Sequence, residues 1–390
     1  MSDQLDIACY YYAPAKLPLL RAAVLPAARW AAGQGTGVHL ERHWRHGPHL
    51  RIRLSRHTPA GPAAKSGTGV DLAGVAGTVA DRLRRYLTTH PSTEQIGTAE
   101  LLAQAEQAGR AELVPPPYEP IHPDNTVRIE PVDDTALAVL LESAAAVECR
   151  ARLLQLGLPA VAASAERLAA AGDSASARVR LCLTAMSLHA SRYPLGLGAG
   201  HQSFLSHLEE FLVFNDPTGQ VRGAFDDHWR RRADPVTELV ARLADGAADA
   251  AELAWQEWTA TAWATAEAAY RRGELPAVPG FTYLSRAEQV GDPEIVHRWH
   301  PDRTEYSDYH QLLGQIDFSR VPYEREFVTY RFATNVLYLL LGLLDVRPLE
   351  RYLAAYLLSR AAERITGVTW QERINGYLDR LAATAEEVRP

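Results

Sequence analysis

The stretch HWRHGPHLRIRLSRH, residues 43–57, gathers four histidines and four arginines in a chain whose net charge is −7. Its second half alternates between apolar and polar residues, which predicts a β-strand with one buried face. The apolar side chains are Leu50, Ile52 and Leu54, and the polar ones are His49, Arg51, Arg53 and Ser55. We expect the apolar side to face the core and the basic side to face outward or into a cleft.

The residues around this strand predict a small α/β unit. Strands are expected over residues 6–12, 38–44 and 49–55, with a tight turn at Gly47 and Pro48 between the last two. A helical pattern over residues 17–32 ends at Gly33. The proline-rich segment 114–131 cannot be helical and reads as an extended connector. We therefore expect an α/β unit with a basic hairpin and an extended connector over residues 1–131.

The rest of the chain is mainly helical in its spacing. Helices are expected within residues 70–111, 133–214, 236–272 and 323–388, whereas residues 275–322 are loop-rich with short strands. The predicted fold class is α+β, mostly helical with a strand-rich N-terminal unit. The mainly helical part is expected over residues 132–390, and we expect the whole to be one compact protein.

Composition excludes several classes of protein. The chain has 390 residues, 47% of them apolar, so it can bury a large core. An acidic net charge gives no general attraction to nucleic acid or to an anionic membrane. The three cysteines are scattered, the N-terminus has no secretory pattern, and the longest apolar run, Val336 to Leu344, is shorter than the roughly 20 residues that span a bilayer. We expect a cytoplasmic protein with no nucleic acid and no membrane partner.

The basic hairpin is open to several interpretations. It can be a solvated face, a clamp for carboxylates or peptide carbonyls, or a grip on RNA phosphates. A metal site at His43, His46 and His49 is disfavoured, because a tight turn separates them and Glu41 is the single acidic neighbour. RNA is disfavoured because few aromatic residues are interleaved with the arginines.

Three stretches carry a resemblance to a known family: HWRHGPHLRIRL in the hairpin, GHQSFLSHLEEFL over residues 200–212 and EFVTYRFATNVLYLLLGLLDVRPLERYLAAYL over residues 326–357. In this order they resemble the C-terminal module of class I lantibiotic dehydratases and the stand-alone thiopeptide proteins related to it. The resemblance spans most of the chain and implies the fold of that elimination module.

Two departures from the family pattern favour one of its branches. Members that eliminate glutamate carry a Y-x-x-E-x-x-RYGG motif and a histidine on the late helix; here the first region reads YEPIHPDNTVRIEP, and Tyr330 and Arg331 stand where that histidine is expected. The resemblance then implies a pyridine synthase, which joins two dehydroalanines of a leader-bearing peptide in a formal [4+2] cycloaddition and expels water and the leader amide. A glutamate-eliminating lyase and a non-catalytic leader-binding partner remain alternatives.

The candidate site follows from the proton transfers of that reaction, for which His, Tyr and Ser are suited. A helix starting near Gln202 places Ser203, Ser206, His207 and Glu210 on one stripe. We expect His207 to shuttle protons, Ser206 and Tyr193 to bind the imidic oxygen, His201 to be a second acid and Glu210 to fix the tautomer of His207. The alternative is that Ser203 caps the helix and His207 forms a surface pair.

The resemblance implies that residues 1–131 bind the leader peptide and that residues 132–390 form the catalytic part. Ser55 is a catalytic candidate if the hairpin lines the same cleft. The expected leader- and substrate-binding residues are Arg42, Arg45, His49, Arg51, Arg53, Ser203, Glu210, Tyr330 and Arg331. The expected partner is a dehydroalanine-containing precursor peptide with its leader. The reaction requires no cofactor and no metal, and a homodimer is left open.

Overall fold

The computed structural model describes residues 3–56, 70–275, 282–316 and 325–387. The chain divides into two compact units, each built from three segments. Unit 1 comprises Met1–Gly172, Ala268–Pro301 and Asn335–Asp345, and unit 2 comprises Asp173–Glu267, Asp302–Thr334 and Val346–Pro390. The expected boundary after residue 131 lies inside unit 1, directly after its last strand.

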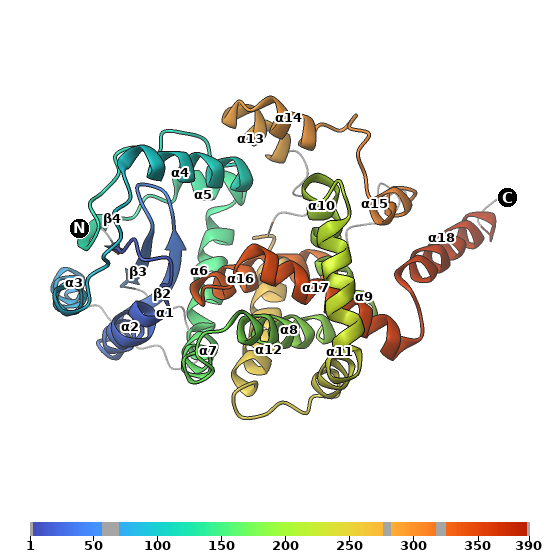
Figure 1. The fold of residues 1–390 in the computed structure, drawn as a ribbon, viewed down its shortest axis with the longest axis horizontal. Helices are drawn as coiled ribbons and strands as arrows, with labels where there is room; N and C mark the ends of the chain where they lie inside the picture. Colours follow the sequence, from blue (N-terminus) through green and yellow to red (C-terminus); the bar gives the residue numbers. More distant parts are fainter. Residues whose placement is uncertain (1–2, 57–69, 276–281, 317–324, 388–390) are drawn as a thin grey trace. The chain divides into compact units, whose positions relative to one another are not determined.

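Unit 1 contains a four-stranded sheet in the order β2-β3-β1-β4, with all neighbouring strands antiparallel (Figure 1). The strands are β1 (Gln4–Tyr10), β2 (Gly37–His43), β3 (His49–Ser55) and β4 (Thr126–Pro131). The three strands expected from the sequence are confirmed. The fourth corrects the prediction, because the last six residues of the expected connector pair with β1.

The apolar face of the sheet is buried under helices. Leu40, Leu50, Ile52 and Leu54 are fully buried, and α2 (Leu25–Gly33) packs on β2 while α3 (Leu72–Thr89) packs on the other three strands. The expected helix over residues 17–32 is confirmed, with one difference. It consists of α1 (Leu17–Leu19), the π-helical turn η1 (Leu20–Val24) and α2.

The polar face of the sheet is covered as well. Leu101 of α4 (Thr98–Glu112) packs against Ala8, Tyr10 and Tyr12, and α6 (Ala144–Leu156) packs on β2. The short helix α5 (Thr135–Leu140) leads into α6, which is followed by α7 (Leu158–Ala170). A sheet that is covered on both faces leaves little room for a freely solvated basic surface.

The expectation of loops with short strands over residues 275–322 is wrong for the part that the structure describes. This part forms three helices, α13 (Thr282–Val290), α14 (Pro293–Trp299) and α15 (Asp308–Leu313). Asp292 accepts hydrogen bonds from the N–H groups of Glu294 and Ile295, and Ser307 accepts one from His310. These N-terminal caps favour helix over strand.

Unit 2 is helical throughout its described residues. Its central helix, α8 (Ala175–Ser191), is buried from Leu181 to Ala190 and packs against α11 (Gln220–Ala244) and α17 (Pro348–Thr366). Arg178 at the start of α8 binds Glu350 at the start of α17, with N–O distances of 2.8–3.1 Å. The other helices are α9 (Leu197–Gly200), α10 (Gln202–Asn215), α15 and α18 (Trp370–Glu387), while α12 (Leu253–Arg271) and α16 (Arg325–Leu343) begin in unit 2 and end in unit 1.

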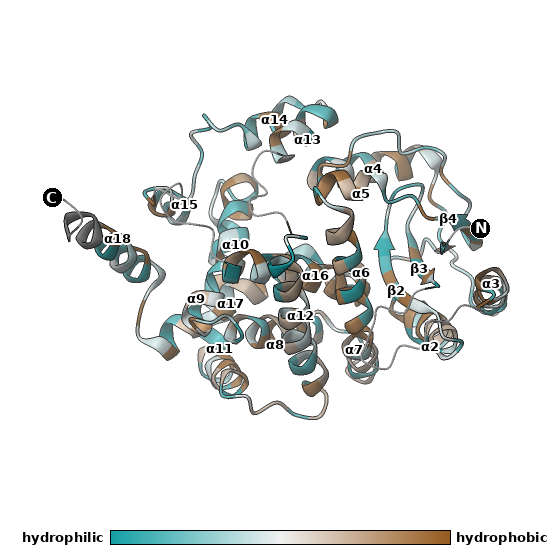
Figure 2. Ribbon diagram, turned by 180° about the vertical axis from the view of Figure 1, so that it is seen from behind, coloured by the Kyte–Doolittle hydropathy of each residue, from teal (hydrophilic) through white to brown (hydrophobic). Residues whose placement is uncertain are grey.

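The α+β fold class expected from the sequence is confirmed, with strands only at the N-terminal end of the described chain. In Figure 2 the helices carry bands of both hydrophobic and hydrophilic colour, as helices with one apolar side do. The three cysteines are buried and free. None of the described helices is long and apolar enough to cross a membrane. The predicted loop at residues 58–69 lies outside the described residues.

Candidate functional site

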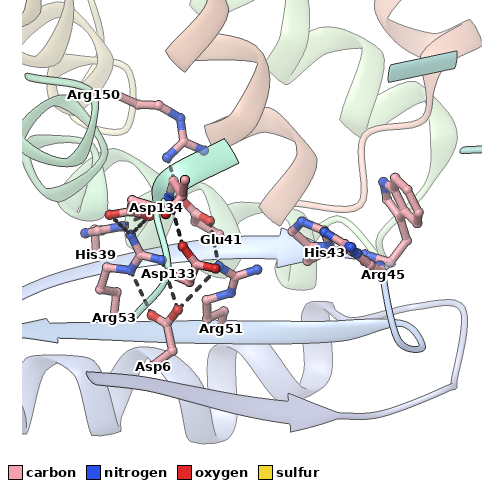
Figure 3. Close-up of polar contacts among 12 residues, drawn as sticks. Asp6, His39, Glu41, His43, Arg45, Arg51, Arg53, Asp133, Asp134 and Arg150 are labelled. Atoms are coloured by element: carbon pink, nitrogen blue, oxygen red, sulfur yellow. Dashed lines mark hydrogen bonds and ion pairs between the residues drawn. The ribbon is translucent and has the colours of Figure 1, made fainter. Parts of the chain in front are cut away.

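The polar face of the sheet in unit 1 carries a group of charged side chains that bind one another (Figure 3). We call it the sheet network; its members are Asp6, Glu41, Arg51, Arg53, Asp134 and Arg150. Arg53 lies at its centre. Its Nε and Nη2 atoms donate to the two oxygens of Asp6 at 2.8 and 2.9 Å, and its Nη1 donates to Asp134 at 2.6 and 2.8 Å. Both edges of the guanidinium group are thus occupied.

The remaining members balance the charges of the sheet network. Nη1 of Arg51 lies 3.4 Å from Asp6 and 3.7 Å from Glu41, and Arg150 of α6 donates to Glu41 at 2.5 Å. Burial alone would raise the pKa of Glu41, but Arg150 and other cationic neighbours hold it well below its usual value. Three arginines therefore face three carboxylates, and the group as a whole is neutral.

This arrangement corrects the expected orientation of the basic face. His49 and Arg53 are only 4% exposed, so they face neither solvent nor an open cleft. The interpretation as a solvated face is wrong at these positions as well. The alternation along β3 is as expected, but carboxylates on β1, on β2 and before α5 neutralise the arginines, and α6 covers them. Arg53 and His49 are therefore unsuited to bind a leader peptide in this arrangement.

Neutral rings occupy the turn end of the same face. His43 and His49 stack at a centroid distance of 5.5 Å, and His49 contacts Tyr10 at 4.7 Å. Burial lowers the pKa of His49 to about 3, and it lowers that of His43 well below its usual value. Arg45 at the turn is more open and donates to the carbonyl oxygen of Pro117 at 3.0 and 3.2 Å. Among the described residues, no three His, Cys, Asp or Glu side chains form a metal-binding group.

Arg42 points to the opposite side of β2 from the sheet network. It binds the carboxylate of Asp345, which also accepts the backbone N–H groups of Lys16 and Leu17 at 2.7 Å each. Arg42 therefore has a structural partner, and its expected role in leader binding stays a prediction. Ser55, at the end of β3, also belongs to unit 1, whereas the other catalytic candidates belong to unit 2.

In unit 2, helix α10 begins at Gln202, as expected. Its apolar side chains Phe204, Leu205, Leu208 and Leu212 are buried. The alternative, a cap by Ser203, is wrong, because His201 occupies the N-cap position and makes no side-chain capping bond. Ser206 and His207 are half-buried on the other side of the helix. The stripe of polar side chains predicted from the spacing is thus present.

Ser206 has a partner that the sequence did not indicate. Its Oγ lies 3.0 Å from Nε2 of His310 in α15, and Nδ1 of His310 lies 2.9 Å from Oγ of Ser307. We call these three residues the α10 relay. Burial lowers the pKa of His310, so its ring is neutral at physiological pH. A hydroxyl within hydrogen-bond distance of a neutral imidazole is the arrangement that activates serine in acid–base chemistry.

His207 and Glu210 lie near the α10 relay. Burial lowers the pKa of His207 to about 4, aided by Arg351 and Arg331, so His207 is also neutral. Glu210 binds Arg303 through two bonds of 2.8 and 2.9 Å. Part of the Glu210 carboxylate is therefore committed to Arg303, and its expected role in fixing the tautomer of His207 stays a prediction.

Aromatic rings gather around the end of α8. Tyr330 stacks on His189 at a centroid distance of 4.4 Å, and Tyr193 meets Tyr330 edge-on at 5.0 Å. The Tyr330 hydroxyl donates to the carbonyl oxygen of Gly200 at 2.9 Å. Two residues named from the sequence, Tyr193 and Tyr330, are therefore brought together. The sequence analysis missed His189, whose pKa burial lowers to about 3.

His201 differs from its predicted chemistry. Its Nδ1 lies 3.0 Å from the carbonyl oxygen of Leu197, to which it donates, and burial lowers its pKa to about 4. A neutral ring with its hydrogen committed to a carbonyl is a proton acceptor at Nε2, so the role of second acid is disfavoured. Sequence spacing could not reveal this, since the pKa depends on burial.

Comparison with known proteins finds matches among solved structures but not among family models or curated sequences. No protein-family model matches the sequence, and no curated protein matches it. One solved structure, "Pyridine synthase, TbtD, from thiomuracin biosynthesis", is 23% identical with a TM-score of 0.65, over 94% of this chain and 99% of that chain. A second, "Crystal structure of TsrL", is 16% identical with a TM-score of 0.60, over 96% of this chain and 98% of that chain.

The chain has the fold of these two proteins. The resemblance inferred from the hairpin and the two helical motifs is thereby confirmed at the level of the fold. Because each match covers nearly the whole of both chains, it includes both unit 1 and unit 2.

Proposed function

We propose that this protein is a pyridine synthase of thiopeptide biosynthesis. It joins two dehydroalanines of a leader-bearing peptide in a formal [4+2] cycloaddition and then eliminates water and the leader peptide amide. The observation that supports this most is the fold shared with TbtD over 94% of the chain. The neutral imidazoles and hydroxyls of unit 2 support it further, because every step moves protons and none moves electrons to or from the protein.

In this proposal the residues of unit 2 carry the chemistry. His207 is neutral and half-buried, so it can take a ring proton and return it during the eliminations. Tyr193 donates to the imidic oxygen, and Ser203 and Arg331 contact the peptide. Tyr330 is only 2% exposed and its hydroxyl donates to a backbone carbonyl oxygen, so it positions Tyr193 and does not contact the peptide itself. Holding the two alkenes of one peptide in reacting geometry lowers the entropic part of the activation free energy, by at most roughly 7 to 11 kcal/mol.

Mass spectrometry tests the proposal directly. The protein is incubated with a leader-bearing peptide that contains two dehydroalanines, and the expected products are a core lacking one water and a leader ending in an amide. A peptide with alanine at both positions is the control and should keep its mass. An unchanged mass of the dehydroalanine peptide would overturn the proposal.

The alternatives then separate by their own products. Formation of dehydroalanine from a glutamylated peptide would place the protein among the glutamate-eliminating lyases. Binding of the leader without any product from either peptide would make it a non-catalytic partner.

The role of His207 is tested by His207→Ala, with His228→Ala on the exposed side of α11 as a matched control. We expect the first variant to lose about 100-fold or more in kcat and the second to keep the parent value. Equal turnover by both variants would remove His207 from the mechanism.

A further inference from the structure

Resting on this proposed function, we propose that His310, held by Ser307, accepts the proton of the substrate amide through Ser206. The α10 relay joins two segments of unit 2 that are 104 residues apart. Ser206 is half-buried and reachable by a substrate, whereas Ser307 is only 8% exposed and lies behind the imidazole. The order from substrate inward is therefore hydroxyl, imidazole and second hydroxyl.

The hydrogen bonds of His310 fit the tautomer that the relay requires, with the hydrogen on Nδ1. Ser307 caps α15, and its Oγ already accepts the backbone N–H of His310 at 3.2 Å. The same oxygen has a second lone pair for the ring Nδ1–H, which lies 2.9 Å away. This leaves the lone pair of Nε2 directed at Ser206, 3.0 Å away, as a base requires.

The charges that face His310 suit a transient imidazolium. Glu210 and Glu209 of α10 favour its protonation, and Arg303 and burial oppose it. Glu210 is itself bound by Arg303, and Glu209 by Arg222, so both carboxylates are fixed in place. The ring thus starts neutral, and the two carboxylates stabilise the imidazolium that forms when it takes a proton.

Every proton moved during imidic acid formation and water elimination has a donor and an acceptor. Ser206 takes the proton from the amide nitrogen while its own proton passes to Nε2 of His310, and a second group protonates the carbonyl oxygen, giving the imidic acid. After cycloaddition, His310 returns its proton through Ser206 to the hydroxyl that departs as water, breaking the C–O bond. The group that protonated the carbonyl oxygen takes the ring proton lost in the same elimination. Both groups are then restored.

The kinetic test compares two like substitutions. His310→Gln keeps a hydrogen-bonding group facing Ser206 but cannot carry a proton, so kcat should fall about 100-fold or more with KM nearly unchanged. His228→Gln, at an exposed position of α11, is the control and should match the parent chain. A His310→Gln variant within about twofold of the parent kcat overturns the relay while the pyridine synthase proposal stands.

Ser307 is a positioning residue, and its variant has a signature that a purely structural role lacks. Ser307→Ala removes the acceptor for Nδ1–H, which makes the imidazolium less stable and lowers the pKa of His310. Because the base must be neutral, activity is lost as the pH falls through this pKa. We expect the acid limb of the kcat profile to move to lower pH in Ser307→Ala, and an unmoved limb overturns the role of Ser307.

A measurement made without substrate tests the hydrogen bonds of the α10 relay independently of turnover. Nitrogen NMR of the imidazole should show His310 with its hydrogen on Nδ1 and a shift of Nε2 alone upon Ser206→Ala. A hydrogen on Nε2 in the parent protein overturns the relay, whatever the turnover. If the parent protein forms no macrocycle, the proposed function fails, and the NMR result still decides whether Ser206 is paired as described.

Discussion

The sheet network of unit 1 and the α10 relay of unit 2 use similar polar residues in opposite ways. In the sheet network, three arginines and three carboxylates satisfy one another and are covered by helices. In the α10 relay, the half-buried Ser206 and His310 lie in front of the buried Ser307, and no residue of the relay carries a fixed charge. Dense charge therefore marks structure here, whereas a sparse neutral arrangement is suited to chemistry.

The largest expected effect comes from removing the centre of the sheet network. Arg53→Met removes the guanidinium group from the buried Asp6 and the partly buried Asp134, which should lower the free energy of unfolding by about 3 to 5 kcal/mol in chemical denaturation. Arg85→Met, on the exposed side of α3, is the control and should change it by less than about 0.5 kcal/mol. If both variants unfold at the same denaturant concentration, the sheet network is not structural.

A triple variant shows whether the loss of stability comes from unpaired charges or from packing. Replacing Arg53 with Met and both Asp6 and Asp134 with Leu removes the unpaired charges along with their partner. We expect it to recover most of the stability lost by Arg53→Met, because an apolar group of similar volume can replace a buried ion pair. A triple variant no more stable than the single one would assign the loss to packing.

The next largest effect is a loss of stability at acid pH, to which one histidine of each unit contributes. The pKa values of His49 in unit 1 and His201 in unit 2 are lowered to about 3 and 4 by burial. The unfolded chain binds a proton at each below its usual pKa of about 6.5, but the folded chain does not. Stability is thus complete above about pH 6.5 and falls as the pH drops toward 4.

The test is the pH dependence of unfolding between pH 6 and pH 5. His49→Asn and His201→Asn should each reduce the slope by about 1.4 kcal/mol per pH unit, since each removes one proton bound only by the unfolded chain. Above pH 7.5 each variant should have the same slope as the parent. A slope that is unchanged at acid pH would mean that the ring is protonated in the folded protein.

The smallest effect concerns the exposed end of the hairpin. Arg45 is partly exposed, and the structure shows its guanidinium group bound to a carbonyl oxygen and, among the described residues, to no carboxylate, so we choose it to test leader binding by the hairpin. Arg45→Ala should raise KM for a leader-bearing peptide about two- to fivefold, which corresponds to an exposed ion pair of up to about 1 kcal/mol. Arg232→Ala, exposed on α11, is the control. The effect should shrink at high salt, and a KM equal to that of the control would exclude Arg45 from leader binding.

Local features of both regions could be predicted from the sequence. The period-two pattern located β3 to the residue, and the apolar spacing placed the start of α10 at Gln202. Each of these rests on side chains a few positions apart. The predicted β2 and β1 followed in the same way, from alternation and from turn residues.

Long-range partners could not be predicted from one sequence. Asp134 and Arg150 meet the hairpin only because α5 and α6 fold over the sheet, and His310 meets Ser206 from a helix that was expected to be loop and strand. Ser307, three residues before His310, offered a signal as a helix cap. The burial that neutralises the histidines had no signal at all in the pattern.

Asp345 has a consequence for how the protein is made. Its carboxylate receives the N–H groups of Lys16 and Leu17 at the start of α1, and the segment Asn335–Asp345 belongs to unit 1. A ribosome makes Lys16 before Asp345, which follows it by 329 residues, so these bonds cannot form until that whole stretch has been synthesised. The sheet is therefore made long before its partner segment, and unit 1 cannot be completed on a nascent chain that stops short of Asp345.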